Sequence, residues 1–374
     1  MYDFSPIAEY MEQVLVAEKG VPGCDVLITR GHQRLFRHTC GNTTENALYF
    51  LYSCTKPVTA AAGMRLVEEG KLSLDHPVAD YLPAFADVYL EENGQRRPPA
   101  RPMTVLNLFT MTAGLNYNFG TPAIREAIAK KGDSAALRDM VDALPVLPLD
   151  FDPGERFQYS LCHDVLAAVI EVAAGERFSD YLRRILFDPL EMADSTFHPS
   201  PEQMQRMADQ FTSDNTGKVT PIPKFNPFKL TPAFESGGAG LISSTADYSK
   251  FADTMACGGM AYNGYRLLKP ETVRMMHTEQ LHRFVRNPAS FGCASGPGYG
   301  YGLGVRTRID QNHGERTPLG EFGWDGAAGA YIMMDTQNAL SIAFTMHVRN
   351  WPACIGTGHG PIRELTYAAL GVGK

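Results

Sequence analysis

Ser53 and Lys56 are the residues of this sequence whose types and spacing point most directly to chemistry. They lie where an apolar run over 47–52 gives way to a helix-like pattern over 57–69. Residues three apart on a helix share a face, so the lysine amine is expected one turn above the serine hydroxyl. A hydroxyl needs a base to become a nucleophile, and a lysine whose pKa is lowered by desolvation can serve. The pair predicts a nucleophile and its base, although an N-cap serine followed by a surface lysine has the same pattern.

Tyr159 is the second candidate for proton transfer. It precedes an apolar stripe of helical period over 161–173, which ends at Gly175, so we expect it at a helix entrance. A packed aromatic is the simpler interpretation of any single tyrosine. Together with Ser53 and Lys56, however, a phenolate stabilised by the lysine is expected to take the serine proton and later to activate water.

A glycine-rich stretch over 320–329 is the third candidate, and it leads into a strand pattern that starts at 330. Glycine in a strand lets a ligand approach the backbone closely, and such an edge can offer an N–H to a developing oxyanion. A tight turn between two strands explains this stretch equally well when it is considered alone.

Strand patterns occur near both ends of the chain, and helical patterns dominate the middle. The expected strands are 25–30, 34–39, 302–309, 330–335 and 340–348. The expected helices are 8–19, 57–69, 105–112, 134–144, 161–173, 245–257, 270–277 and 361–370. We therefore predict an α+β fold, with a sheet domain formed by 1–65 and 236–374 and an inserted, mostly helical domain over 66–235. The cleft between them would be the binding site.

The composition is that of a globular protein and argues against nucleic-acid and membrane partners. The chain has 374 residues, of which 44% are hydrophobic and 20% charged, as in ordinary globular proteins. The net charge of −7 argues against a nucleic-acid partner, and there is neither a basic tract for membrane attachment nor an apolar run long enough to span a bilayer. The N-terminus has no signal-peptide pattern, which predicts a cytoplasmic protein.

The cysteines and histidines give no metal or cofactor motif. The seven cysteines are an odd number and include no C-x-x-C pair, so we expect free thiols, mostly buried. His277 and His282 are five residues apart with no partnering cysteine. We therefore expect no metal site and no cofactor.

Six segments, taken in order, resemble the serine β-lactamase-like superfamily, in particular its branch of class C β-lactamases, family VIII carboxylesterases and penicillin-binding-protein-like enzymes. The S-x-x-K motif is the nucleophile motif of that superfamily. The six segments are 53–56, 69–75, 108–115, 159–161, 237–244 and 324–326. The resemblance implies a β-lactamase/transpeptidase-like fold, in which helices flank an antiparallel sheet and a mostly helical domain is inserted.

The resemblance also implies roles for individual residues. Ser53 would be the acylated nucleophile, and Lys56 with Tyr159 would form the base pair. The backbone N–H groups of Ser53 and Ala327 would make the oxyanion hole. Water would then release the acyl group from the serine.

Two positions depart from the β-lactamase pattern. Leu161 replaces the asparagine of Y-x-N, which would hold the acylamino group of a β-lactam, and Trp324 replaces the lysine of K-T-G, which would meet its carboxylate. An ionised Asp325 beside the tryptophan would repel a substrate carboxylate. Both changes resemble the esterase branch and favour a carboxylesterase of small or medium neutral acyl esters. The residues expected to contact substrate are Leu161, Trp324, Asp325, Gly326 and Tyr117.

Other functions stay open. The partner is a small-molecule ester or amide, so a β-lactamase or a D-amino-acid peptidase-type amide hydrolase is the alternative, followed by an acyltransferase or a catalytically silent scaffold. No G-x-S-x-G is present, so no α/β-hydrolase nucleophile is expected. His163 and His347 are weaker candidates for lining the site. The Ser-Asp-Asn sequence at 213–215 is expected to be a surface turn. The sequence does not indicate an oligomeric state.

Overall fold

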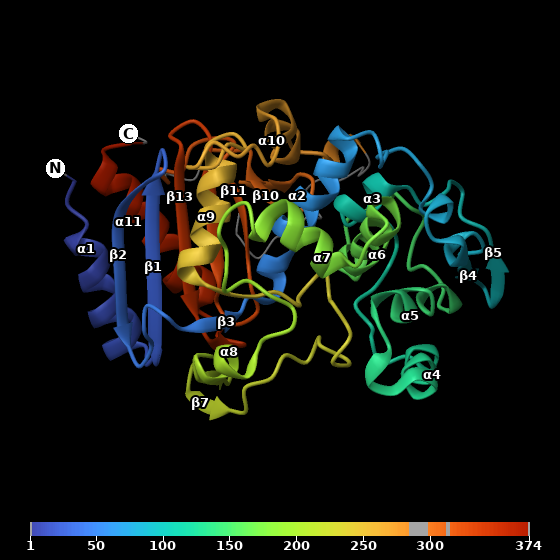
Figure 1. Ribbon diagram of the computed structural model, residues 1–374, viewed down its shortest axis with the longest axis horizontal. Coiled ribbons are helices and arrows are strands. Elements are labelled where there is room, and N and C mark those ends of the chain that lie inside the picture. The colour runs from blue at the N-terminus through green and yellow to red at the C-terminus, as the bar shows by residue number, and fades with distance from the viewer. Residues whose placement is uncertain (1, 284–297, 312–314, 373–374) are drawn as a thin grey trace.

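The computed structural model describes residues 2–283, 298–311 and 315–372 and is built around one seven-stranded sheet (Figure 1). The strand order is β2-β1-β13-β12-β11-β10-β9, and every neighbouring pair is antiparallel. The strands are β1 (Gly23–Arg30), β2 (Gln33–Gly41), β9 (Tyr299–Tyr301), β10 (Arg306–Arg308), β11 (Phe322–Asp325), β12 (Tyr331–Asp335) and β13 (Leu340–Met346). The first strand therefore pairs directly with the last long one, so both ends of the chain build the sheet.

Both faces of the sheet are covered by helices because the central strands are apolar on both sides. On one face lie α1 (Ser5–Glu9), the π-helical continuation Tyr10–Glu18 and α11 (Gly360–Leu370), packed on side chains such as Val26 and Ile342. On the other face lies α9 (Thr245–Ala256), against β13, β1 and β12. Trp324 on β11 belongs to the core on this second side, which is also the side of the helical segments.

The helical segments lie between the sheet's two halves in the sequence. They are α2 (Thr55–Glu68), α3 (Val105–Phe109), α4 (Pro122–Lys131), α5 (Leu137–Val141), α6 (Cys162–Ala174), α7 (Phe178–Leu182) and α8 (Pro201–Gln205), with α10 (Pro270–Met276) later in the chain. The almost fully buried helix α2 packs against α6, and the two share one core. Within the described residues, no helix is long and apolar enough to cross a bilayer.

The sequence predictions of fold class, of the first hairpin and of most helices are confirmed, but several strands differ. Strands β9 and β11 were not predicted, and the strand expected over 302–309 is only Arg306–Arg308. The helix expected over 134–144 is limited to Leu137–Val141. Three small sheets were not predicted either. Two of them are pairs, β3 (Leu48–Phe50) with β8 (Ile242–Ser244) and β4 (Leu90–Glu92) with β5 (Gln95–Arg97), and the third has three strands, β6 (Gln210–Ser213), β7 (Val219–Ile222) and β14 (Val348–Arg349). Domain boundaries at residues 65 and 236 stay a prediction.

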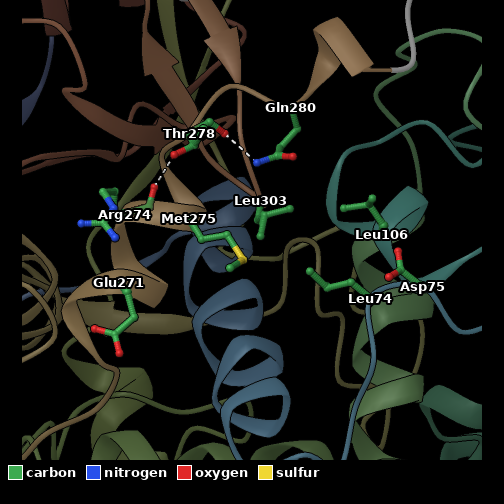
Figure 2. Close-up of a pocket in the computed structure, with 9 residues that line it drawn as sticks. All are labelled: Leu74, Asp75, Leu106, Glu271, Arg274, Met275, Thr278, Gln280 and Leu303. Atoms are coloured by element: carbon green, nitrogen blue, oxygen red, sulfur yellow. Dashed lines mark hydrogen bonds between the residues drawn. The ribbon is translucent and has the colours of Figure 1, made fainter.

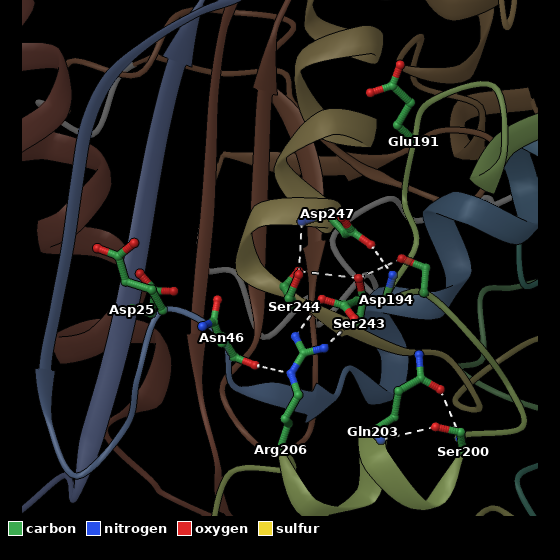
Figure 3. Close-up of polar contacts among 12 residues, drawn as sticks. Asp25, Asn46, Glu191, Asp194, Ser200, Gln203, Arg206, Ser243, Ser244 and Asp247 are labelled. Atoms are coloured by element: carbon green, nitrogen blue, oxygen red, sulfur yellow. Dashed lines mark hydrogen bonds and ion pairs between the residues drawn. The ribbon is translucent and has the colours of Figure 1, made fainter.

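A polar network fixes the start of α9 to the segment before α8 (Figure 3). Ser244 caps α9 by accepting a hydrogen bond from the Asp247 N–H, and an Asp247 oxygen accepts one from the Asp194 N–H at 2.6 Å. Arg206 binds both oxygens of Asp194 at 2.7 and 2.6 Å. The network holds β8, and β8 directly follows the glycine-rich segment that contacts the candidate nucleophile.

Candidate active site

Ser53 lies in a single 3-10 turn, Tyr52–Cys54, directly before α2. Tyr52 has a φ of 47°, a left-handed conformation that costs a bulky residue about 1 kcal/mol or more and is common next to active sites. The turn is held from two sides, because Thr55 Oγ1 donates to the Tyr52 carbonyl at 2.7 Å and Tyr248 OH donates to the Cys54 carbonyl at 2.6 Å. The strained turn thus fixes the direction of the Ser53 side chain.

The three predicted catalytic side chains meet at the Ser53 hydroxyl. Lys56 Nζ donates to Ser53 Oγ at 3.2 Å, and Tyr159 OH donates to the same oxygen at 2.6 Å. Tyr159 comes from 106 residues further along the chain, at the entrance to α6. The serine oxygen therefore has two hydrogen-bonding groups, each able to carry its proton.

The pKa of the Lys56 amine is shifted in the direction that catalysis needs. Its side chain is fully buried, and this desolvation lowers its pKa from 10.5 to about 8, against the opposing attraction of Asp164. Its second hydrogen bond goes to the Gly238 carbonyl at 2.9 Å. A neutral amine is consequently accessible at mildly alkaline pH, and a neutral amine can accept the Ser53 proton.

Tyr159 is a neutral phenol in the free protein. Burial is the main cause that raises its pKa above 10, and the hydrogen bond to Ser53 only partly opposes this. Its ring stacks between Tyr117, at 5.6 Å between centroids, and Trp324, at 5.8 Å. The Lys56 ammonium lies 4.5 Å from the Tyr159 centroid, which favours the charged amine and a later phenolate alike. The phenolate expected from the sequence is therefore not the resting form.

Asp164 is a residue that the sequence analysis did not single out. It is buried on the first turn of α6, where Ser236 Oγ donates to its Oδ1 at 2.6 Å. Burial raises its pKa, whereas the hydrogen bond from Ser236 and the charge of Lys56 lower it. A carboxyl group within an apolar helical stripe was the available signal, but only the fold shows that it lies beside Lys56.

The glycine-rich segment 237–240 sits between these two charged groups. A Cβ built on Gly238 would lie 2.8 Å from Asp164 Oδ2 and 3.5 Å from Lys56 Nζ. A larger residue would have to displace one of them, so glycine is required by close packing. The segment also accepts a hydrogen bond from Thr59 Oγ1 at the Gly237 carbonyl, which ties it to α2.

The loop over 108–115 has a positioning role. The Met111 carbonyl accepts a hydrogen bond from the Gln158 N–H at 2.8 Å, and Ser160 Oγ contacts Met111 Sδ. The Asn116 carbonyl, just beyond the loop, accepts from the Leu161 N–H. The loop therefore holds the residues on both sides of Tyr159 in place.

The third predicted motif lies on β11 and the turn after it. Strand β11 ends at Asp325, and the turn closes with hydrogen bonds from the Gly326 N–H to the Ala330 carbonyl and from the Gly329 N–H to the Gly326 carbonyl. A Cβ on Gly326 would lie 2.2 Å from the Leu51 carbonyl oxygen, so β11 touches the backbone just before the nucleophile turn. Ala327 is exposed at the tip of this turn. An oxyanion hole formed by the N–H groups of Ser53 and Ala327 stays a prediction.

The residues that depart from the β-lactamase pattern, Leu161 and Trp324, lie at the start of α6 and on β11. Leu161 is buried at the start of α6 and presents no polar group, and Trp324 forms an aromatic wall against Tyr159. Burial raises the pKa of Asp325, while the charge of Arg306 lowers it. An aromatic side chain therefore lies beside Tyr159 where the β-lactamase pattern has a lysine, and contact of Leu161 and Asp325 with substrate stays a prediction.

The weaker candidates are packed in the interior. His163 is fully buried in α6 and burial lowers its pKa to about 3, while His347 is buried against Tyr49 and Phe50 and its pKa is lowered to about 4. Both are neutral packed histidines. The 213–215 sequence is the end of β6 and the turn into β7, as predicted.

A separate pocket of about 410 Å³ lies beside α10 (Figure 2). Its walls come from α10, the loop after α2, the start of α3 and Leu303, and they mix apolar and charged side chains. Ser53, Lys56 and Tyr159 do not line it.

Known proteins that are similar to this chain belong to one family and include esterases. Residues 7–355 match the model of the Beta-lactamase family. Esterase EstB of Burkholderia gladioli is 28% identical over 87% of this chain and 86% of its own length, and lovastatin esterase of Penicillium rubens is 28% identical over 78% and 77%. The solved structure of EstCE1, described as a hydrolase with promiscuous acyltransferase activity, superposes with a TM-score of 0.79 at 25% identity, over 97% of this chain and 98% of its own.

Proposed function

Since this chain belongs to the Beta-lactamase family and is a serine hydrolase, we propose that it is a carboxylesterase acting on small or medium neutral acyl esters. The observation that carries the proposal is the double hydrogen bond to Ser53 Oγ from Lys56 and Tyr159, beside the indole of Trp324. The esterases among its relatives support the same substrate class.

The geometry suggests the order of proton transfers. Neutral Lys56 takes the proton of Ser53 as its oxygen attacks the ester carbonyl carbon, and the carbonyl oxygen becomes an oxyanion held by the N–H groups of Ser53 and Ala327. The tetrahedral intermediate collapses when Tyr159 donates its proton to the leaving alkoxide, and the lysine ammonium reprotonates the phenolate. This leaves an acyl group on Ser53, a free alcohol and a neutral amine.

Deacylation repeats these steps with water as the nucleophile. The phenolate–ammonium form of the pair, or neutral Lys56, removes a proton from water as it attacks the acyl carbon, and Ser53 leaves with a proton returned by the same groups. Because the two titrating groups interact closely, the pair as a whole is the base, and the proton does not belong to one residue.

The experiment is a paired rate assay on p-nitrophenyl butyrate and on a chromogenic cephalosporin, with the natural sequence and with Ser53→Ala. We expect ester hydrolysis that the substitution abolishes and slow cephalosporin turnover. Fast cephalosporin turnover would refute the interpretation of Leu161 and Trp324 and favour the amide hydrolase. Turnover of neither substrate would favour a silent scaffold.

Acyl transfer to an alcohol is the second candidate, because EstCE1 is described as having this activity. Adding butanol to the ester assay would test it, since a transferase forms the butyl ester at the expense of free acid. A cytoplasmic location also stays a prediction.

A further inference from the structure

Three side chains with different donor atoms converge at the end of the β1–β2 hairpin, away from the residues assigned to catalysis. His32 lies in the hairpin turn, while Asp253 and Cys257 lie four residues apart on α9 and just after it. One ligand atom from each of the three lies within 4.8 Å of the others. In Figure 1, the hairpin turn and the C-terminal end of α9 lie at the same end of the sheet.

The contacts within the cluster centre on the carboxylate. Asp253 Oδ2 lies 2.7 Å from His32 Nδ1, and Asp253 Oδ1 accepts a hydrogen bond from the His32 backbone N–H at 3.1 Å. Cys257 Sγ lies 3.9 Å from the same Oδ1. The two elements are 221 residues apart in sequence, so the fold brings these donors together.

The Asp253 carboxylate is buried without a lysine or arginine partner among the described residues. The Asp253 side chain is only 8% exposed, and its one ion-pair partner among the described residues is the imidazole of His32. Buried carboxylates are normally paired with a full cation or bind a metal ion. A divalent cation held by a carboxylate and a thiolate would be neutralised by their two charges.

We infer that His32, Asp253 and Cys257 form a binding site for a zinc-like divalent metal ion. Imidazole nitrogen, carboxylate oxygen and thiolate sulfur are the three ligand types of zinc, and three protein ligands with one water complete a tetrahedron. Metal–ligand distances of about 2.0–2.3 Å would place the donor atoms about 3.3–3.6 Å apart. The 2.7 Å between His32 Nδ1 and Asp253 Oδ2 would have to lengthen by about half an ångström. The other separations are at most 4.8 Å and would have to shorten by at most about 1.5 Å, which side-chain rotation can supply.

The site would join the hairpin to α9. The ion would bind Nδ1 of His32, with the ring's N–H on Nε2, and would replace the thiol proton of Cys257, which is released to solvent. His32 is 30% exposed, which leaves an entry path and a place for the water ligand. No metal site was predicted from the sequence, because no local spacing links His32 to the other two residues.

The test uses tag-free full-length protein treated with a chelator and then titrated with Co²⁺ and, separately, with Zn²⁺. We expect one Co²⁺ per chain, with the thiolate-to-cobalt charge-transfer absorption and the visible bands of tetrahedral cobalt. We expect Zn²⁺ to displace it and to raise the melting temperature, since it binds only the folded chain.

Variants identify the ligands. Cys257→Ser should remove the charge-transfer absorption and weaken binding about tenfold or more, since the loss of a mere outer-shell partner already costs that much. His32→Asn should weaken binding similarly, and asparagine tolerates the left-handed φ of 68° found at this position. If the serine variant does not fold, the zinc titration of His32→Asn decides the question. Ester hydrolysis should persist in both variants, which separates this test from that of the proposed function.

Two other cysteines serve as matched controls, because each has a second donor close by. Cys40 Sγ lies 3.6 Å from Cys24 Sγ, and Cys354 Sγ lies 3.3 Å from His359 Nε2. Cys40→Ser and Cys354→Ser should leave the cobalt spectrum unchanged. Absence of one-to-one binding, or binding lost in a control variant and kept in Cys257→Ser, would overturn the inference.

Discussion

Replacing Lys56 by methionine should abolish esterase activity and change how the stability of the fold depends on pH. The lysine is fully buried and burial lowers its pKa from 10.5 to about 8. Between these two values the lysine binds more protons in the unfolded chain than in the folded one, so the contribution of Lys56 to stability rises with pH in this window. Below pH 8 the folded state carries the full cost of a buried ammonium.

The magnitude follows from linkage. With a folded pKa of about 8 and an unfolded one of 10.5, Lys56 destabilises the fold by about 3 kcal/mol at pH 7 and by about 1 kcal/mol at pH 9.5. The free energy of unfolding of the natural protein, minus that of Lys56→Met, should therefore increase by about 2 kcal/mol from pH 7 to pH 9.5. The lost hydrogen bond to the Gly238 carbonyl affects both conditions alike, so it largely cancels in this comparison.

Urea unfolding followed by circular dichroism, at pH 7 and pH 9.5 for both proteins, measures the difference. Lys130→Met is the matched control, because the Lys130 side chain is 71% exposed and its ammonium stays solvated in the folded state. The control should follow the natural protein at both pH values. If the Lys56→Met difference also stayed constant within about 0.5 kcal/mol, the argument that burial keeps this amine partly neutral would be wrong.

Three further predictions concern catalysis. The kcat/KM of the natural protein should rise as the pH passes through about 8, since only neutral Lys56 accepts the Ser53 proton, and a profile already flat below pH 7 would contradict this. Tyr159→Phe should lower kcat by about 10²-fold or more while urea unfolding stays nearly unchanged, because the ring keeps its stacking and loses only its hydroxyl group; near-normal turnover would remove the tyrosine from the mechanism. Gly326→Ala should lower kcat and cost about 1–3 kcal/mol of stability, because its Cβ would lie 2.2 Å from the Leu51 carbonyl oxygen; full activity with normal urea unfolding would show that the turn is free to move.

The parts of the site that follow from local spacing could be predicted from the sequence. Ser53 and Lys56 are three residues apart, and the pattern placed them correctly at the start of a buried helix. The apolar period over 161–173 placed Tyr159 at a helix entrance. In both cases the relevant geometry is set within one or two turns of helix, which is the range over which a pattern is informative.

The parts that depend on tertiary packing could not be predicted. Strand β11 was not anticipated because its sequence is short and glycine-flanked, and it is a strand only through pairing with β10 and β12. In the sequence Asp164 is an ordinary polar residue, and only the packing of α6 on α2 brings it close to Lys56. The protonation of Tyr159 also depends on burial between Tyr117 and Trp324, which no local pattern specifies.

The most direct test of the account is covalent labelling of the nucleophile. The protein would be incubated with a fluorophosphonate, and the intact mass and the modified peptide would be determined for the natural sequence, Ser53→Ala and the matched surface variant Ser134→Ala. We predict one adduct per chain, on Ser53, that is absent only from Ser53→Ala. No adduct on the natural protein, or an adduct that persists in Ser53→Ala, would contradict the central claim that Ser53 is the activated nucleophile.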